Sequence, residues 1–321
     1  MAGEVRNKRR ALELRTRLNA LIRGFFAQRA VLEVETPILS AAGNTDLHIQ
    51  GFVTRFDGPV ETGGRERFLR TSPEYPLKRM LAADLGDCYE LGRVFRNGEA
   101  GRSHNPEFTL LEWYRIGWDH HRLMDECAEL VREALSLAGR DAGVRKTSYI
   151  NWFRQELDLD PISAGEPALR APLAEFGIDP QGLDRDDWLD LLVTHRLQPA
   201  LAGDAITLVY DYPPSQCALA RIRDGDPPVA ERFELYLGTR ELANGYHELN
   251  DAAEQRARFE RNNARRRERG LRELPIDENL LAVLDDLPDC AGVALGVDRL
   301  LMCLLRTDDI RDVLAFPFAE A

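Results

Sequence analysis

The chain has 321 residues, of which 44% are hydrophobic and 30% charged, as is typical of a globular protein with one large domain or two small ones. Its 54 acidic and 42 basic residues give a formal net charge of −12, a field that repels polyanions and disfavours general nucleic-acid binding. No apolar run approaches the roughly 20 residues of a membrane span, no secretory signal is visible, and the five cysteines form no C-x-x-C pair. We therefore expect a cytoplasmic protein with reduced thiols.

The N-terminal part of the chain predicts a helix, a strand and then a hairpin. Residues 8–29 place Leu14, Leu18 and Ile22 at helical spacing, and residues 31–34 form a strand that ends at Thr36-Pro37. The hairpin pairs a strand at 88–95 with a strand at 107–117 across a polar loop at 96–106.

After this hairpin, Asp119 caps an amphipathic helix that runs to Leu137. Short helical patterns broken by prolines indicate a helical insertion at about 139–204. The remaining elements are strands at 206–214, 216–222, 229–238 and 240–249, helices at 251–269 and 277–286, and a strand that leads into a helix over 290–305. Strands without a regular βαβ alternation predict one α+β domain with a mostly antiparallel sheet flanked by helices.

The strand at 107–117 carries the first chemical signal. Its alternation puts Phe108, Leu110 and Glu112 on one face, so an aromatic platform for a base and a carboxylate can share that face. An antiparallel core strand with a polar edge would give the same pattern. The basic run Arg265–Arg269 is interpreted as a solvated helix end, because cations favour helix C-termini and Gly270 follows.

Two later segments indicate a nucleotide and a cation. Gly292 and Gly296 lie in a strand followed by Arg299 at a helix start, an arrangement that suits a close ligand with a phosphate tail. Glu234 and Glu241 lie in neighbouring strands, where a hairpin brings both carboxylates to one Mg²⁺. A tightly packed strand and solvated carboxylates are the structural alternatives. No P-loop and no G-x-G-x-x-G is present, so an ATP site here is of another type.

Taken together, these segments carry a family resemblance. Three segments resemble motifs 1, 2 and 3 of class II aminoacyl-tRNA synthetases: LEVETP with the preceding helix, FRNGEAGRSHNPEFTLLEWY and GVALGVDRL, in that order. Three further segments resemble the lysine-specific branch of these synthetases: TSPEYPLKRML, RFELYLGTRELANGYHELNDAAEQ and IRDVLAFPF. Motif 1 begins near the N-terminus, which leaves no room for an anticodon-binding domain. The chain is therefore most similar to the paralogues of that branch that attach (R)-β-lysine to elongation factor P.

The resemblance implies a role for each matching residue. Arg96 and Arg299 are the catalytic residues. Arg96 contacts the α-phosphate and the substrate carboxylate, and Arg299 contacts the γ-phosphate. Phe108 stacks on adenine. The other ATP contacts are Asn97, Gly98, His104, Asn105, Glu241, Leu242 and Gly296, while Glu234 and Glu241 hold Mg²⁺. The substrate contacts are Ser72, Pro73 and Glu74 at one amine, Glu112, Tyr114 and Glu248 at the side-chain ammonium, Asn244 near the carboxylate, and Ala294.

Two positions depart from the pattern of lysyl-tRNA synthetases. Their motif 2 has Arg-x-Glu, whereas this chain has Arg96-Asn97-Gly98 with Glu99 one place later, so the carboxylate has either shifted by one residue or is missing. Ala294 stands where those enzymes carry glycine, and the β-lysine ligases are similar to this chain in having alanine. A methyl group there can exclude an α-amine and favour a β-amine.

The resemblance implies an ATP- and Mg²⁺-dependent ligase that forms an adenylate of (R)-β-lysine and transfers the acyl group to a lysine of elongation factor P. It also implies a homodimer through motif 1, where Phe25, Phe26 and Val31 lie. A compact lysyl-tRNA synthetase that charges tRNA and a non-enzymatic amino-acid sensor remain as alternatives. The presence of Arg96, Arg299, Glu234 and Glu241 argues against the sensor.

Overall fold

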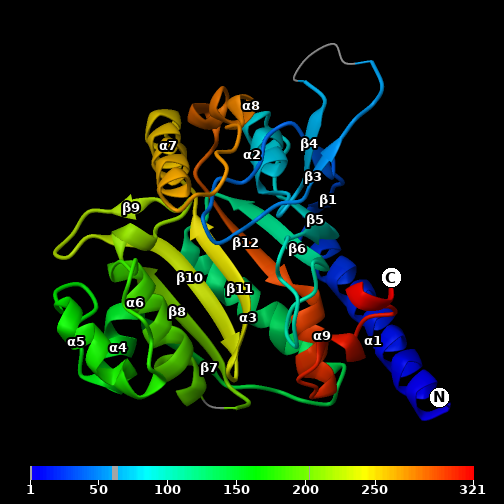
Figure 1. Cartoon of the computed structure of the whole chain (residues 1–321). Helices are drawn as coiled ribbons and strands as arrows, with labels where there is room; N and C mark the ends of the chain where they lie inside the picture. The colour runs from blue at the N-terminus through cyan, green and yellow to red at the C-terminus, as the bar shows by residue number, and fades with distance from the viewer. Residues whose placement is uncertain (1, 60–63, 202) are drawn as a thin grey trace.

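The computed structural model describes residues 2–59, 64–201 and 203–321. Its centre is a nine-stranded sheet in the order β1-β5-β6-β12-β11-β10-β8-β7, with β9 paired to β10 (Figure 1). The strands are β1 Leu32–Glu33, β5 Cys88–Phe95, β6 Glu107–Ile116, β7 Val144–Ser148, β8 Ile206–Tyr212, β9 Ile222–Arg223, β10 Val229–Leu237, β11 Arg240–His247 and β12 Cys290–Gly296. Among the described strands only β1–β5 and β7–β8 pair in parallel. The predicted α+β class is confirmed.

Three helices pack their apolar faces on one side of this sheet: α1 (Ala2–Ala27), α3 (His120–Ser136) and α9 (Val297–Leu305). Leu18, Ile22 and Phe26 of α1 are fully buried there, as their helical spacing predicts. The N-cap prediction for α3 is confirmed, because Asp119 accepts a hydrogen bond from the backbone N–H of Arg122 at 2.8 Å. None of the helices in the described ranges is long and apolar enough to cross a membrane.

The segment 139–204 adds helices on the other side of the sheet and also a strand. Its helices are α4 (Tyr149–Leu157), α5 (Glu166–Arg170) and α6 (Arg185–Leu192), and their core includes Trp152 and Trp188. The strand β7 pairs in parallel with β8 and extends the main sheet. Sequence analysis missed it because only Thr147 of this edge strand is buried, so no apolar alternation marks it.

The hairpin of β10 and β11 forms as predicted, with Gly238 at φ +56° in its turn. A β-carbon at Gly238 would lie 2.5 Å from the backbone oxygen of Gly203, so glycine is needed there. The strand predicted at 216–222 is wrong. That segment holds a 3-10 turn (Pro214–Gln216) and Ala218 at φ +47°, and strand β9 begins only at Ile222.

A third group of helices gathers at one end of the sheet (Figure 1). It consists of α2 (Glu74–Ala82), α7 (Ala252–Glu268) and α8 (Glu278–Leu281), and a small sheet of β2 (Leu39–Ser40), β4 (Glu66–Leu69) and β3 (Val53–Arg55) completes the described strands. The solvated helix end predicted at 265–269 is wrong for Arg266. Its side chain is buried and donates to the backbone oxygens of Arg272 and Asp46.

Candidate active site

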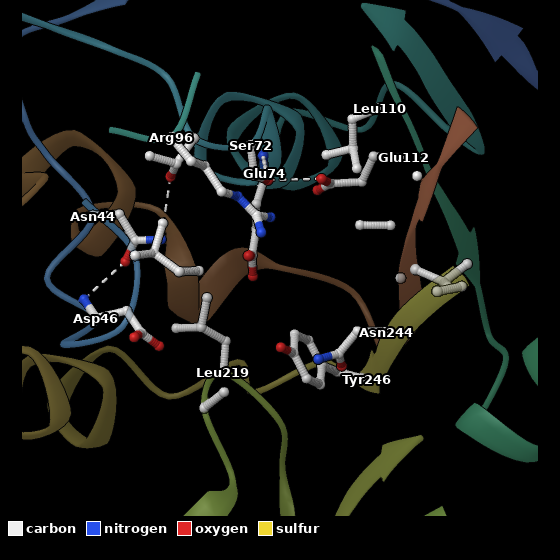
Figure 2. A pocket seen from close by; sticks show the side chains of 18 of the residues that line it. Asn44, Asp46, Ser72, Glu74, Arg96, Leu110, Glu112, Leu219, Asn244 and Tyr246 are labelled. Atoms are coloured by element: carbon white, nitrogen blue, oxygen red, sulfur yellow. Dashed lines mark hydrogen bonds between the residues drawn. The ribbon is translucent and has the colours of Figure 1, made fainter. Parts of the chain in front are cut away.

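A cleft of about 1360 Å³, counting its open mouth, lies on the face of the sheet opposite α3. Its floor is formed by β6, β12 and β11, and its walls are the start of α2, the loop between β5 and β6, the segment 44–49 and α7. Figure 2 shows Ser72, Glu74 and Arg96 facing Asn244 and Tyr246 across it. No sequence pattern marked the lining residues of the segment 44–49, which lies in a loop.

Strand register explains how the floor is assembled. Ala294 of β12 lies between Glu112 of β6 and Asn244 of β11. A β-carbon on Gly292 would come within 2.3 Å of the Tyr114 ring and 2.5 Å of a Glu248 oxygen, so this glycine makes room for both side chains. The carboxylate, the phenol and the amide expected at the substrate are therefore brought to one place.

Glu112 is the centre of the buried end of the cleft. Its carboxylate accepts hydrogen bonds from the Ser72 hydroxyl at 2.6 Å and from the Tyr114 hydroxyl at 2.8 Å. Burial, reinforced by Glu74, raises the pKa of Glu112 to about 8, although both hydrogen bonds oppose the shift. A carboxyl group with a pKa raised in this way binds a proton near neutral pH.

Lys78 is the principal residue that sequence analysis missed. Its ammonium lies 2.6 Å from oxygens of both Glu74 and Glu248, and its side chain is 2% exposed. Burial would lower the pKa of Lys78, but Glu248 and Glu74 outweigh it and raise that pKa, so the side chain is charged. The i,i+4 spacing of Glu74 and Lys78 was the one signal available, and such pairs are common on solvated helices.

Glu248 is therefore already paired within the protein, instead of standing ready for a substrate ammonium alone. Burial raises its pKa to about 7, and the Lys78 cation limits that rise. The amide oxygen of Asn244 is also buried and has no hydrogen-bond partner among the described residues. Buried polar atoms of this kind are the mark of a site that a polar ligand completes.

The other end of the cleft carries the two arginines. The Arg96 guanidinium lies 5.1 Å from the centre of the Phe108 ring and 3.8 Å from a Glu99 oxygen. Arg299 donates to the His104 ring nitrogen Nε2 at 2.6 Å and to the backbone oxygen of Glu241 at 3.2 Å. Burial and the Arg299 charge lower the pKa of His104, so its ring is neutral and Nε2 can accept this hydrogen bond.

Most predicted site residues line the cleft, including Asn105, Leu242 and Gly296. Four do not: Pro73, Asn97, Gly98 and Glu234. The backbone N–H of Asn97 donates to Gln50, and Gly98 adopts φ +85° in the loop. Glu99 lines the cleft beside Arg96. Tyr246, Gln255, Arg258 and Phe259 also line the cleft and were not predicted.

Glu234 and Glu241 were predicted to hold a cation together. Burial and the nearby Glu234 carboxylate raise the pKa of Glu241, so the two acids are close enough to repel each other. Glu234 accepts hydrogen bonds from Arg232 and Tyr236, both at 2.5 Å. Two carboxylates this close together are a set of oxygen ligands that suits Mg²⁺, which binds few protein ligands.

Comparison with known proteins places this fold and site in a class. The family model described as class II tRNA synthetases (D, K and N) matches residues 4–320. Curated relatives from Yersinia enterocolitica and Vibrio cholerae, each named elongation factor P–(R)-β-lysine ligase, are both 49% identical to the chain. The alignment with the Yersinia protein covers 96% of this chain and 94% of that protein. The alignment with the Vibrio protein covers 97% of this chain and 96% of that protein. The chain belongs to the class II tRNA synthetase family and, within it, to the family of these ligases.

Proposed function

We propose that this protein is an ATP-dependent ligase that activates (R)-β-lysine as an adenylate and transfers it to a lysine side chain of elongation factor P. The observation that carries the proposal is one cleft with two chemically different ends, an arginine and aromatic end for a nucleotide and a buried carboxylate end for amines. Relatives that are 49% identical over almost their whole length bear the name of this activity.

Charge at the carboxylate end supports a substrate with two ammonium groups. Glu74, Glu112 and Glu248 contribute three negative charges when ionised, and Lys78 contributes one positive charge, which leaves two negative charges. Lys78 is thus a built-in counter-ion, and Glu112 and the outer oxygen of Glu74 remain for the ligand. Buried charges must be paired, so a diamine matches this pocket better than a monoamine.

For the first step, Arg96 binds the α-phosphate and the substrate carboxylate and Phe108 stacks on the adenine. Arg299 binds the γ-phosphate, with Glu241, Leu242, Gly296, His104 and Asn105 around the nucleotide. A carboxylate oxygen of β-lysine attacks the α-phosphorus, and pyrophosphate leaves. No protein nucleophile is required, because positioning and charge neutralisation supply the catalysis. Mg²⁺ held by Glu241 and Glu234 would neutralise phosphate charge in this step.

For the second step, the neutral amine of an acceptor lysine attacks the adenylate carbonyl, AMP leaves with the bonding electrons, and the amine loses a proton to solvent. The acceptor loop would dock at the open mouth of the cleft, and the chain's net charge of −12 disfavours tRNA. The five cysteines are free thiols, which agrees with the cytoplasm as the place of this reaction.

We also propose that the enzyme works as a homodimer formed along α1 and β1. Phe25, Phe26 and Val31, predicted for that contact, are instead buried in the core of the single chain. Leu32 and Leu39, which are 51% exposed, together with Leu12 and Ile38, are the apolar side chains available there. Light scattering on the wild type and on a Leu32→Glu, Leu39→Glu variant tests this interface.

Mass spectrometry of elongation factor P after incubation with the enzyme, ATP and either lysine isomer tests the central proposal. We expect one β-lysyl group on one lysine and slower addition of α-lysine. A parallel reaction with bulk tRNA measures the alternative. Faster charging of tRNA than of elongation factor P would replace this proposal with a compact tRNA synthetase, and no adenylate at all would indicate a sensor.

A further inference from the structure

A second cluster of ligand-type side chains lies on the far side of the sheet from the cleft. It consists of His120 at the start of α3, Glu231 on β10 and His247 on β11, all of them buried. One ligand atom from each of the three residues lies within 4.8 Å of the other two. His120 also forms a similar set with His121 and Asp211, so Asp211 borders the same cluster.

Hydrogen bonds account for most polar atoms of this cluster but leave one unexplained. His247 Nδ1 lies 2.5 Å from Glu231 Oε2, and His247 Nε2 lies 2.9 Å from Asp289 Oδ1. His120 Nε2 lies 3.1 Å from Asp211 Oδ1. Nδ1 of His120 is buried and has no hydrogen-bond partner among the described residues. The side chain is only 1% exposed, so bulk water does not reach it. An ion-pair network alone would leave this nitrogen unsatisfied, which is unfavourable.

Arg223 orients the two carboxylates. Its guanidinium donates to Glu231 Oε1 at 2.8 Å and to Asp211 Oδ2 at 2.6 Å. These contacts use the outer oxygen of each carboxylate and turn Glu231 Oε2 and Asp211 Oδ1 toward the two histidines. Outer hydrogen bonds that fix ligand carboxylates in this way are a regular feature of protein metal sites.

We propose that His120, His247 and Glu231 bind a divalent transition-metal ion such as Zn²⁺. Two imidazole nitrogens and carboxylate oxygens suit zinc, whereas Mg²⁺ prefers oxygen ligands alone. Ligand atoms around a tetrahedral zinc ion are roughly 3.3 Å apart, as follows from bond lengths of about 2.0 to 2.1 Å. The present ligand atoms lie within 4.8 Å of one another, and the metal would take the place of the proton shared by His247 and Glu231.

The position of this site indicates a structural role. The ion would join the first residue of α3 to β10 and β11, the hairpin that carries Glu234 and Glu241 toward the cleft on its other face (Figure 1). The cluster lies on the other face of β11 from the cleft, because His247 points away from the lining residues Tyr246 and Glu248. Metal binding should therefore raise the melting temperature, whether or not the proposed ligase activity is correct.

The test is calorimetric titration of the full chain, freed of metal with a chelator, with zinc chloride. We expect one equivalent of Zn²⁺ to bind to the wild type, and at least about 10-fold weaker binding to His120→Ala and His247→Gln. Two controls should bind as the wild type does: His195→Ala, a histidine that packs on Phe176 outside the cluster, and Glu241→Gln in the cleft.

A cobalt titration of the wild type gives a second measurement that needs no variant. Four-coordinate Co²⁺ would produce strong visible absorption bands that zinc abolishes. His120→Ala removes a buried ring and its hydrogen bond to Asp211, so circular dichroism is used to check that the variant folds. Absence of a stoichiometric zinc site in the wild type, or equal zinc affinity of the wild type and His120→Ala, would overturn the proposal. Loss of binding in Glu241→Gln alone would assign the metal to the cleft.

Discussion

The two ends of the cleft hold their charges in different ways. At the nucleotide end the Arg96 and Arg299 side chains are 25% and 27% exposed, and their closest carboxylate oxygens are 3.8 and 3.6 Å away. At the amine end Lys78 and Glu248 are 2% and 1% exposed and are 2.6 Å apart. The first end holds partly exposed cations with long ion-pair contacts, whereas the second is a nearly fully buried and tightly paired network.

This difference follows from the charge of the proposed ligands. A triphosphate brings several negative charges and its own metal ion, so partly exposed arginines can be paired when it arrives. A diamine brings two positive charges. A small pocket can distinguish a diamine from a monoamine only if its carboxylates are already oriented and largely desolvated. Substitutions at the two ends should therefore separate effects on rate from effects on stability.

Arg96→Ala should produce the largest effect on rate and little effect on stability. Loss of a cation that neutralises the reacting phosphate should slow pyrophosphate exchange with β-lysine roughly 10²- to 10³-fold. The melting temperature should change little, because Arg96 makes only long contacts. Arg93→Ala, at an exposed arginine of the preceding strand, is the control and should keep full activity. Full exchange activity in Arg96→Ala would remove this residue from the site.

Lys78→Met should produce the largest effect on stability. Removal of one partner leaves Glu74 and Glu248 uncompensated, which should lower the free energy of unfolding by about 3 to 5 kcal/mol. The control Lys146→Met breaks a surface pair with Asp125 and should lose about 0 to 1 kcal/mol. Denaturant titration of both variants measures the difference. Equal losses would show that Lys78 is an ordinary ion pair.

Ala294→Gly should change substrate preference within the amine end. The methyl group lies between Glu112 and Asn244, where the substrate amine is expected. Its removal should raise kcat/KM for α-lysine relative to β-lysine roughly 10-fold, as one methyl contact can provide. Ala291→Gly changes the same strand on its other face and should keep the wild-type ratio. An unchanged ratio in Ala294→Gly would place selection elsewhere.

Binding of β-lysine should release about one proton near pH 7. The pKa values of Glu112, about 8, and Glu248, about 7, lie above the usual carboxyl range, so the empty pocket holds protons that the substrate ammonium groups must displace. The affinity should therefore rise as the pH increases from about 6 to about 8. Calorimetry in two buffers with different ionisation enthalpies measures the proton count. Identical heats in both buffers would contradict this coupling.

Glu99→Gln should produce the smallest effect. The carboxylate lies 3.8 Å from Arg96 in a partly exposed loop, so its loss should raise KM for ATP only about two- to five-fold. Glu107→Gln, which alters a similar exposed pair with Arg93, is the control and should leave KM unchanged. A change of 100-fold would mean that Glu99 contacts the nucleotide directly.

Local sequence patterns determined most elements of this fold. Alternation over 107–117 and 88–95 predicted β6 and β5, and Asp119 and Asp251 marked the starts of α3 and α7. Where the local pattern was weak, prediction was wrong: the edge strand β7 lacks apolar alternation, and the segment 216–222 contains enough apolar residues to resemble a strand but turns instead. These errors arise because pairing with a neighbouring strand, which the local sequence does not encode, decides such segments.

The candidate site divides in the same way. The sequence by itself determined which motif residues supply arginines, an aromatic ring and carboxylates, and for strand residues such as Phe108 and Glu112 the position along the strand fixes the face they occupy. Only the tertiary structure decided which charges meet: Lys78 with Glu248, Arg299 with a neutral His104, and His120 with Glu231 and His247. Each of these contacts joins residues far apart in the chain, and its geometry depends on strand register and helix packing, which periodicity along the sequence does not specify.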